Sequence, residues 1–473
     1  MYPPVKQLHS HAKSLVAKFK QGGGTSYIGE VIDLDHEALE LCPPSHPKRT
    51  VSLTWLASHL RLRYSQMGAT GDLEEAIVLD REALDLCPQG HPDRSISLNN
   101  LAVDLSTRHN QLGAMEDLDE AIVLNREALN LRLQGHPLRS NLEALNLCPQ
   151  GHPDRSMSLN NLANRLGTRY KQLGAMKDLD EAIVLDREAL NLRPQRHPHR
   201  SSSLNNLAHC LATRYNQLGA MEDLDEAIVL DREALDLRPK GHPDRSISLN
   251  NLAIRLSTRY KQLGAMEDLD EAIALDREAL ILRLQGHPDR SMSFNNLANR
   301  LSTRYNQLGA MEDLEEAIVI AREALNLRPH RHPLRSSSLN NLAANLSTRY
   351  DQLGAMEDLD EAIVLNQEAL NLRPKGHPDR SMSLNNIAVH LSTRYDQLGA
   401  IEDLDEAIVL DREALSLRPQ GHPLRSNSLN NLASHLGTRY KQLGVMDVRE
   451  FRALWWTKEN DVYILSEYIH KEI

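Results

Sequence analysis

The sequence predicts an all-α solenoid built from pairs of helices, and a fixed internal period is the main reason. A His-Pro pair closes each copy of the repeated unit, and every step between pairs except one is 45 residues. Units of this length cannot bury their apolar face alone and must stack on their neighbours. We expect the layers to build an elongated right-handed superhelix, because the two helices of a unit have buried faces of unequal width. The pairs begin at His46, His91, His136, His152, His197, His242, His287, His332, His377 and His422.

The first helix of each unit is predicted from apolar residues at helical spacing. In the copy at 95–139 these residues include Leu98, Leu101 and Leu105, which lie on one face at about 100° per residue. We expect Ser95 or Ser97 to cap this helix, and Gly113 to end it with a turn.

The second helix is predicted from about Glu116 onward, where acidic residues suit the positive end of the helix dipole. Its apolar residues cover a wider arc, so we expect it to be buried on two sides. A proline such as Pro194 ends the helix in most copies, and a Gly-His-Pro loop leads to the next copy.

The repeated unit resembles the tetratricopeptide repeat over residues 5–444. Its phrase HPDRSxSLNNLA is similar to the variant found in kinesin light chains and in large fungal and bacterial signalling proteins. About one extra turn in the first helix and a longer closing loop distinguish it from the usual unit. The family's small-residue and apolar pattern falls on Leu101, Ala102, Leu105, Ala121 and Ala128, with the closing proline at Pro194 or Pro239.

The period divides the chain into four predicted parts. Residues 1–139 hold repeats 1–3, of which the first is degenerate. Residues 156–444 hold repeats 4–9, followed by the first helix of one more copy. Residues 140–155 contain only the end of a repeat, without the preceding 29 residues, and should interrupt the stack. This break has two interpretations, a hinge between two sub-arrays or a deletion in the gene or its prediction. Residues 445–473 are predicted to cap the last repeat through Phe451, Leu454 and Trp455.

Charge and composition limit the classes of partner. The net charge of −11 comes mostly from the acidic openings of the second helices, so we expect no nucleic-acid partner. No apolar run approaches ~18 residues and the N-terminus does not resemble a signal peptide, which favours the cytoplasm and predicts no membrane partner. We expect four free thiols, at Cys42, Cys87, Cys148 and Cys210.

No pattern in the sequence predicts catalysis, a cofactor or a metal. P-loop, HExxH, GxSxG and paired CxxC motifs are absent. We expect the His-Pro histidines to bond loop backbone. Asp186, Asp231, Asp276 and Asp411 fall inside the apolar arc of second helices, where we expect bridges to arginines at the edge of the first helices. Those arginines are Arg108, Arg169, Arg214, Arg259, Arg304, Arg349, Arg394 and Arg439.

A binding face is predicted opposite the apolar stripe of the first helices, at positions 96, 99, 100, 103 and 107 and their counterparts. The resemblance implies that this face is a concave groove, in which the second residue of a repeated Asn-Asn pair holds a bound peptide's backbone. These residues are Asn100, Asn161, Asn206, Asn251, Asn296, Asn341, Asn386 and Asn431. The position after the next Leu-Ala varies, as in His209, Ile254 and Asn299, and should select the partner.

Two alternatives stay open at this point. The asparagines could instead solvate an exposed face or cross-link adjacent helices. For function, we favour a non-enzymatic scaffold that binds peptide segments of partner proteins. The alternative implied by the resemblance is the sensor half of a larger signalling enzyme, of the CHAT-type caspase-like protease or STAND-type nucleotide-binding ATPase class, whose effector is not in this chain.

Overall fold

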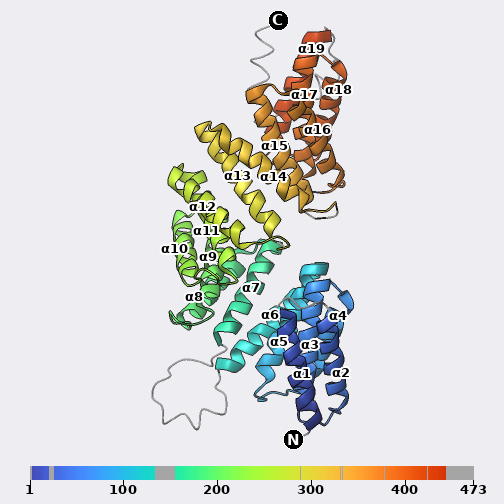
Figure 1. Ribbon diagram of the computed structural model, residues 1–473, viewed down its shortest axis with the longest axis vertical. Helices are drawn as coiled ribbons and strands as arrows, with labels where there is room; N and C mark the ends of the chain where they lie inside the picture. Colours follow the sequence, from blue (N-terminus) through green and yellow to red (C-terminus); the bar gives the residue numbers. More distant parts are fainter. Residues whose placement is uncertain are drawn as a thin grey trace. The chain divides into compact units, whose positions relative to one another are not determined.

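The computed structural model describes residues 3–20, 26–133 and 155–443, except Pro288, Arg331, Pro333, Pro378 and Pro423. Within these residues the chain forms nineteen α-helices and no strand, which confirms the all-α fold class (Figure 1). None of these helices is both long and apolar enough to cross a membrane. The predicted C-terminal cap and Cys148 lie outside the described residues.

By its contacts the chain divides into two units, Met1–His242 and Pro243–Ile473. Odd-numbered helices are the first helices of the repeats, here called helices A, and even-numbered ones are helices B. The first unit contains α1 (Pro3–Lys20), α2 (Ser26–Glu40), α3 (Arg49–Met67), α4 (Thr70–Asp85), α5 (Arg94–Leu112), α6 (Met115–Leu133), α7 (Arg155–Leu173), α8 (Met176–Asn191), α9 (Arg200–Leu218) and α10 (Met221–Asp236). The second contains α11 (Arg245–Leu263), α12 (Met266–Leu282), α13 (Arg290–Leu308), α14 (Met311–Asn326), α15 (Arg335–Leu353), α16 (Met356–Asn371), α17 (Arg380–Leu398), α18 (Ile401–Ser416) and α19 (Arg425–Leu443).

A glycine ends helix A, as the sequence predicts. Gly219 follows α9 with φ +71°, a left-handed conformation that glycine adopts without strain, and its N–H donates to the Tyr215 carbonyl at 2.7 Å. The next residue, Ala220, is extended and leads directly into α10. The two helices of a repeat are therefore joined by a very short connection and pack against each other.

Helix A begins two or four residues earlier than a cap at Ser95 or Ser97 predicts, and these serines do not cap it. The N-cap residue of α5 is Asp93, which makes no side-chain cap bond. Ser95 and Ser97 lie inside the helix and are buried. The Ser97 hydroxyl instead donates to Cys87 Sγ, in the loop after α4, at 3.7 Å.

The core of each repeat is a layer of leucine, isoleucine and alanine. In the α9–α10 repeat, Leu204, Leu211 and Ala227 are completely buried, while Val229 on the outer face of α10 is 64% exposed. One continuous cluster of buried residues runs from α6 through α7, α8, α9 and α10. Burial of this kind of apolar face holds successive repeats together.

The stack is not interrupted between α6 and α7. Leu118 and Ile122 of α6 share a buried cluster with Leu159 of α7. The ion pair that joins successive repeats elsewhere is also present here. Arg169 of α7 binds Asp119 of α6 at 3.0 Å, in the same way that Arg214 of α9 binds Asp180 of α8 at 3.4 Å. The expected interruption is therefore wrong for the helices on either side of residues 134–154.

Candidate functional site

Four positions on each helix A form one stripe on the side away from the core. On α11 they are Ile247, Asn251, Ile254 and Thr258, which fall within an arc of about 60° at about 100° per residue. The buried residues of α11 lie on the opposite side. These residues and their counterparts on other helices A are called the helix-A stripe. They are exposed or half-buried, so four of the five positions lie on the outer side of helix A, as expected.

The fifth position, the first asparagine of each pair, is buried in most repeats, so the prediction that it faces outward is wrong. Asn295 of α13 donates Nδ2 to Ser338 Oγ of α15 at 3.0 Å, and Asn385 of α17 donates to Ser428 of α19 at 3.0 Å. In the first unit, Asn99 bonds Ser158 in the same way at 3.2 Å. The alternative in which asparagines cross-link adjacent helices is thus confirmed for this position.

The second asparagine of each pair behaves differently. All eight of these predicted site residues are half-buried on the stripe. Asn296 donates Nδ2 to Asn250 Oδ1 at 2.8 Å. The other seven side-chain amides make no hydrogen bond to any described residue; they are Asn100, Asn161, Asn206, Asn251, Asn341, Asn386 and Asn431.

The variable stripe position is open to solvent in most repeats. His209, Asn299 and Val389 are exposed, while Ile254 is half-buried. Lys171 of α7 places its Nζ 3.0 Å from His209 Nε2 of α9. The chemistry that this position offers therefore changes from one repeat to the next, while the asparagine beside it stays constant.

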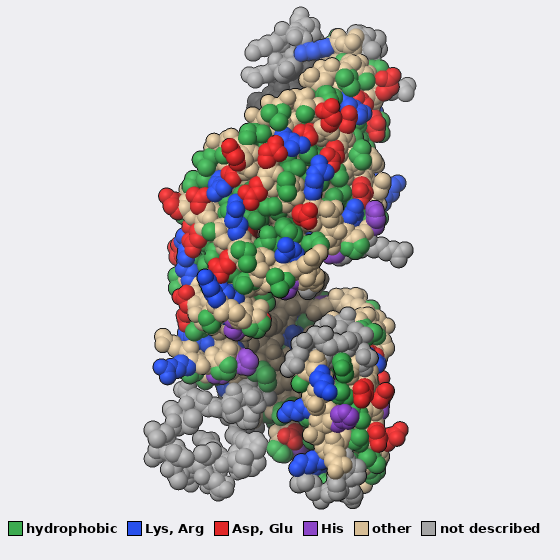
Figure 2. All heavy atoms as spheres, in the orientation of Figure 1, with side chains coloured by type: hydrophobic (Ala, Val, Ile, Leu, Met, Phe, Trp, Pro, Cys, Tyr) green, Lys and Arg blue, Asp and Glu red, His purple; other side chains and the backbone are tan. Residues whose placement is uncertain are grey.

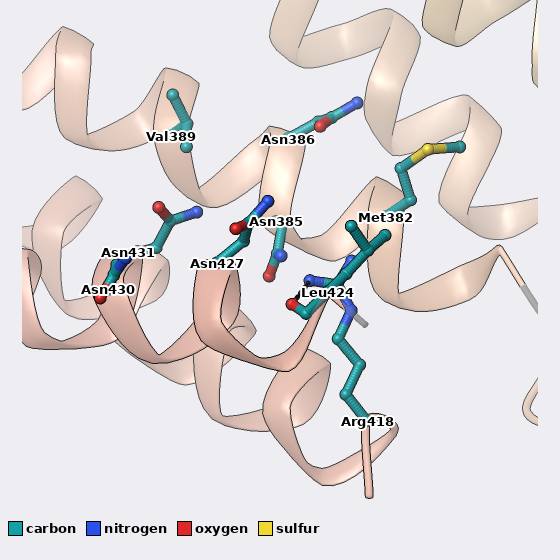
Figure 3. Close-up of a pocket in the computed structure, with 9 residues that line it drawn as sticks. All are labelled: Met382, Asn385, Asn386, Val389, Arg418, Leu424, Asn427, Asn430 and Asn431. Carbon is teal, nitrogen blue, oxygen red and sulfur yellow. Dashed lines mark hydrogen bonds between the residues drawn. The ribbon is translucent and has the colours of Figure 1, made fainter. Parts of the chain in front are cut away.

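The stripe is hollowed between α17 and α19 into a pocket of about 320 Å³ (Figure 3). Met382 and Leu424 lie at one end of this pocket and Val389 at the other. Two of the predicted backbone-binding residues, Asn386 and Asn431, line it. The other lining residues are Asn385, Arg418, Asn427 and Asn430.

Arg418 is the one charged side chain that lines this pocket, and two of its three nitrogens donate to neighbouring groups. Its Nε donates to Ser381 Oγ at 3.1 Å, and its Nη1 donates to Ser428 Oγ at 2.7 Å and to the Leu424 carbonyl at 2.9 Å. The same hub recurs at Arg193, Arg283 and Arg328. The sequence analysis missed these hubs, although a constant arginine before the closing proline is visible in most copies.

The buried aspartates of helices B pair with partners other than those predicted. Asp276 of α12 binds Arg300 of α13, and Asp411 of α18 binds His435 of α19 at 2.7 Å. Asp186 accepts from Asn160 at 2.6 Å and from the Cys210 thiol at 3.6 Å. Each of these aspartates is at most 1% exposed. Burial raises the pKa of Asp186 to about 7 and that of Asp276 to about 6, but neither carboxyl is reachable by a substrate.

The arginines at the edge of helix A bind a different aspartate, in the first turn of helix B of the same repeat. Arg214 donates from Nε and Nη2 to the two carboxylate oxygens of Asp223, both at 2.7 Å. The short A–B turn places these residues opposite each other, out of reach of the mid-helix aspartate. The predicted bridge between that arginine and the mid-helix carboxylate is therefore wrong.

The remaining polar residues singled out in the sequence have structural roles. The Nδ1 atom of His377 accepts from the backbone N–H of Asp379 at 3.1 Å. Six other loops show the same bond at 3.1–3.2 Å, at His46, His91, His197, His287, His332 and His422. Cys42, Cys87 and Cys210 are free and buried, as predicted. Within the described ranges, no three histidine, cysteine or acidic residues are arranged to hold a metal ion.

Comparison with known proteins identifies the repeat. The tetratricopeptide repeat family model matches residues 96–138, 155–199, 247–289, 290–334 and 335–379. No curated protein sequence matches the chain.

Solved structures show similar repeats. The nearly identical TPR-like repeats assigned to a kinesin light chain of Podosopora anserina are 22% identical, with a TM-score of 0.34, over 50% of this chain and 98% of that one. BtubC of P. vanneervenii is 19% identical, with a TM-score of 0.38, over 54% and 90%. A STAND protein with a tetratricopeptide repeat sensor from Pyrococcus horikoshii is 13% identical, with a TM-score of 0.54, over 91% and 55%. The helix pairs and the matched segments together establish that this chain contains tetratricopeptide repeats within residues 96–199 and 247–379.

Proposed function

We propose that the helix-A stripe is a groove that holds peptide segments of partner proteins, and that the chain is a non-enzymatic scaffold. Arrays of this family are scaffolds for protein–protein interaction, and the location of the binding surface is our inference. The observation that carries it is the row of half-buried amides without a protein partner, which includes Asn251, Asn341 and Asn386. An amide offers a donor and an acceptor together, which is what an extended peptide backbone requires.

The roles within this groove divide between two positions. The constant asparagines bind the backbone of the peptide, irrespective of its sequence. His209, Ile254 and Asn299 contact its side chains, because they sit beside the asparagines and are open or half-open to solvent. Partner choice therefore depends on the variable position, and affinity depends on both.

The alternative, a sensor array of a larger signalling enzyme, would use the same surface. The similarity to the STAND protein supports a shared fold and does not extend to an activity. A sensor must also bind something, so the stripe is the site to test in either case.

The test uses a displayed library of random peptides selected on the full chain. Enriched peptides are then titrated against the triple variant Asn251→Ala, Asn341→Ala and Asn386→Ala. We expect a loss of about 0.5–1.5 kcal/mol for each hydrogen bond removed, with little change in stability. Asn296 is left intact because it already bonds Asn250.

The matched control replaces first-position asparagines, such as Asn295 and Asn340, by alanine. These side chains bond Ser338 and Ser383 between helices, so their loss should lower stability and leave affinity per folded molecule unchanged. Peptides that bind the triple variant as tightly as the unmodified chain would refute the proposed function.

A further inference from the structure

The pocket between α17 and α19 contains a guanidinium group without a carboxylate partner. Figure 2 shows Lys and Arg side chains interspersed with Asp and Glu over the face in view, and ion pairs such as that of Arg394 with Asp403 at 2.7 Å are frequent. Arg418 is only 2% exposed, yet it makes no ion pair with any residue that the structure describes. Its Nε and Nη1 atoms donate to neighbours, whereas Nη2 donates to no described group. This buried cation therefore keeps one nitrogen for a ligand.

The preceding layer shows what this nitrogen contacts when the repeat itself supplies a partner. Arg373 is the equivalent arginine, and its Nη1 donates to a serine of the next helix A, as that of Arg418 does. The Nη2 atom of Arg373 lies 3.8 Å from Oδ2 of Asp379. In the layer of α17 and α19, the residue equivalent to Asp379 is Leu424. This exchange removes the carboxylate and leaves the guanidinium in place.

Burial without a counter-ion makes the charge of Arg418 costly. Burial lowers the pKa of both Arg373 and Arg418. Asp379 partly offsets this effect at Arg373, whereas no neighbouring charge offsets it at Arg418. A carboxylate bound in the pocket would supply this attraction and would accept a charge-assisted hydrogen bond, which is stronger than a neutral one.

The rest of the pocket suits a carboxylate. Its volume of about 320 Å³ gives room for a side chain, and none of the residues that line it is acidic. Asn386 and Asn431 line it, and their side-chain amides make no hydrogen bond to the described part of the chain. Each amide can donate to a carboxylate oxygen. Figure 3 shows that Leu424 lies at the same end of the pocket as the nitrogen atoms of Arg418, where Asp379 would lie in the preceding layer.

We propose that this pocket binds an acidic side chain of a partner peptide, whose carboxylate bonds Nη2 of Arg418 in the place that Asp379 takes in the preceding layer. This inference rests on the proposed function and specifies one side chain that the ligand carries.

The test uses two displayed peptide libraries, one with a fixed central glutamate and one with a fixed central glutamine, selected in parallel on the full chain. Peptides enriched from the glutamate library are then titrated by fluorescence anisotropy. Replacing their central glutamate by glutamine should weaken binding at least about tenfold, because a hydrogen bond between charged groups is lost.

Two variants at position 424 separate charge from shape. Leu424→Asp supplies an internal carboxylate, as Asp379 does, and should weaken binding of the glutamate peptides at least about tenfold. Leu424→Asn has the same size without the charge and should change binding less than about threefold. Both variants should fold, because Leu424 is 44% exposed and the equivalent place in other repeats holds an aspartate, as at Asp289 and Asp379.

The chain also offers a matched control. Leu334 makes the same exchange beside Arg328, between α13 and α15, so Leu334→Asp adds the same charge to another layer. It should leave the binding of the glutamate peptides unchanged.

Several results would overturn this inference. Failure of the glutamate library to yield binders, or equal binding of the glutamine forms, would refute the need for a carboxylate. Equal effects of Leu424→Asp and Leu424→Asn, or a loss of the same size through Leu334→Asp, would refute the assignment to Arg418. None of these results refutes peptide binding in general, which the asparagine variants and the fully random library test separately.

Discussion

Removing one member of the buried ion pair between Asp276 and Arg300 should lower the free energy of unfolding more than removing both members. The two side chains are 1% and 7% exposed and bond across the contact between α12 and α13. Asp276→Ala leaves a guanidinium in the core without its counter-ion, which costs roughly 3–5 kcal/mol. The chain itself offers the matched replacement, because the next repeat has Ala321 and Asn345 at the same two positions.

The double variant Asp276→Ala, Arg300→Asn should recover most of this loss. In the next repeat, Asn345 accepts a hydrogen bond from Ser302 Oγ at 2.7 Å. Ser257 occupies the position equivalent to Ser302, one repeat earlier, and is the corresponding donor for an asparagine at position 300. Burial raises the pKa of Asp276 to about 6 even beside Arg300, so the cost of desolvation exceeds the attraction within the pair. We therefore expect the double variant to lie within about 1 kcal/mol of the unmodified chain.

Hydrogen exchange measured by mass spectrometry is the appropriate assay, because repeat arrays open locally and do not unfold as one unit. Amides of α12 and α13 in Asp276→Ala should exchange about a hundredfold to several thousandfold faster, since a loss of roughly 3–5 kcal/mol corresponds to a factor of ten for each 1.4 kcal/mol. Amides of α18 serve as the internal control. A single variant that exchanges as slowly as the double variant would refute the reasoning.

Three further predictions concern stability. Burial raises the pKa of Asp186 to about 7, so this site contributes stability below about pH 4 that is lost as the pH rises to about 7. Asp186→Asn should therefore stabilise the chain by up to about 4 kcal/mol at pH 8 and hardly at pH 4. Equal shifts of the melting temperature at both pH values would contradict this. Deleting residues 140–155 restores the 45-residue spacing and shortens the connection to α7. Chemical unfolding should therefore show a free energy of unfolding about 1 kcal/mol higher, whereas a lower value would mean that this segment supports the stack. Arg328→Ala removes the hydrogen bonds that Arg328 donates to Ser338 Oγ and to the Leu334 carbonyl, and should lower the free energy of unfolding by about 2–5 kcal/mol. Arg328→Cys, which copies Cys87, should cost less, and equal losses in thermal melts would refute the role of the hub.

The helix pairs could be predicted because their signals are local. Apolar spacing, the glycine after helix A and the closing proline each act within a few residues, and Gly219 adopts the expected left-handed conformation. The outward positions of helix A follow from the same period, which is why Asn251 and Ile254 lie where the sequence places them.

The polar contacts could be predicted less well because they depend on the next layer. Whether Asn295 is exposed depends on α15, which covers it and supplies Ser338. The partner of Asp276 is set by the packing of α12 against α13, and a variable residue, Arg300, fills that place. Helical periodicity gives the direction of a side chain but not the element that packs over it.

Photo-crosslinking tests peptide binding at the stripe most directly. A benzoylphenylalanine residue is introduced at Val389, on the stripe of α17, or at Val364, on the outer face of α16. Both positions are exposed, and both belong to the second unit. A library-selected peptide should be captured by the chain carrying the label at Val389 and not by the one carrying it at Val364. Equal capture at both positions, or capture at Val364 alone, would contradict the assignment of the helix-A stripe as the binding groove.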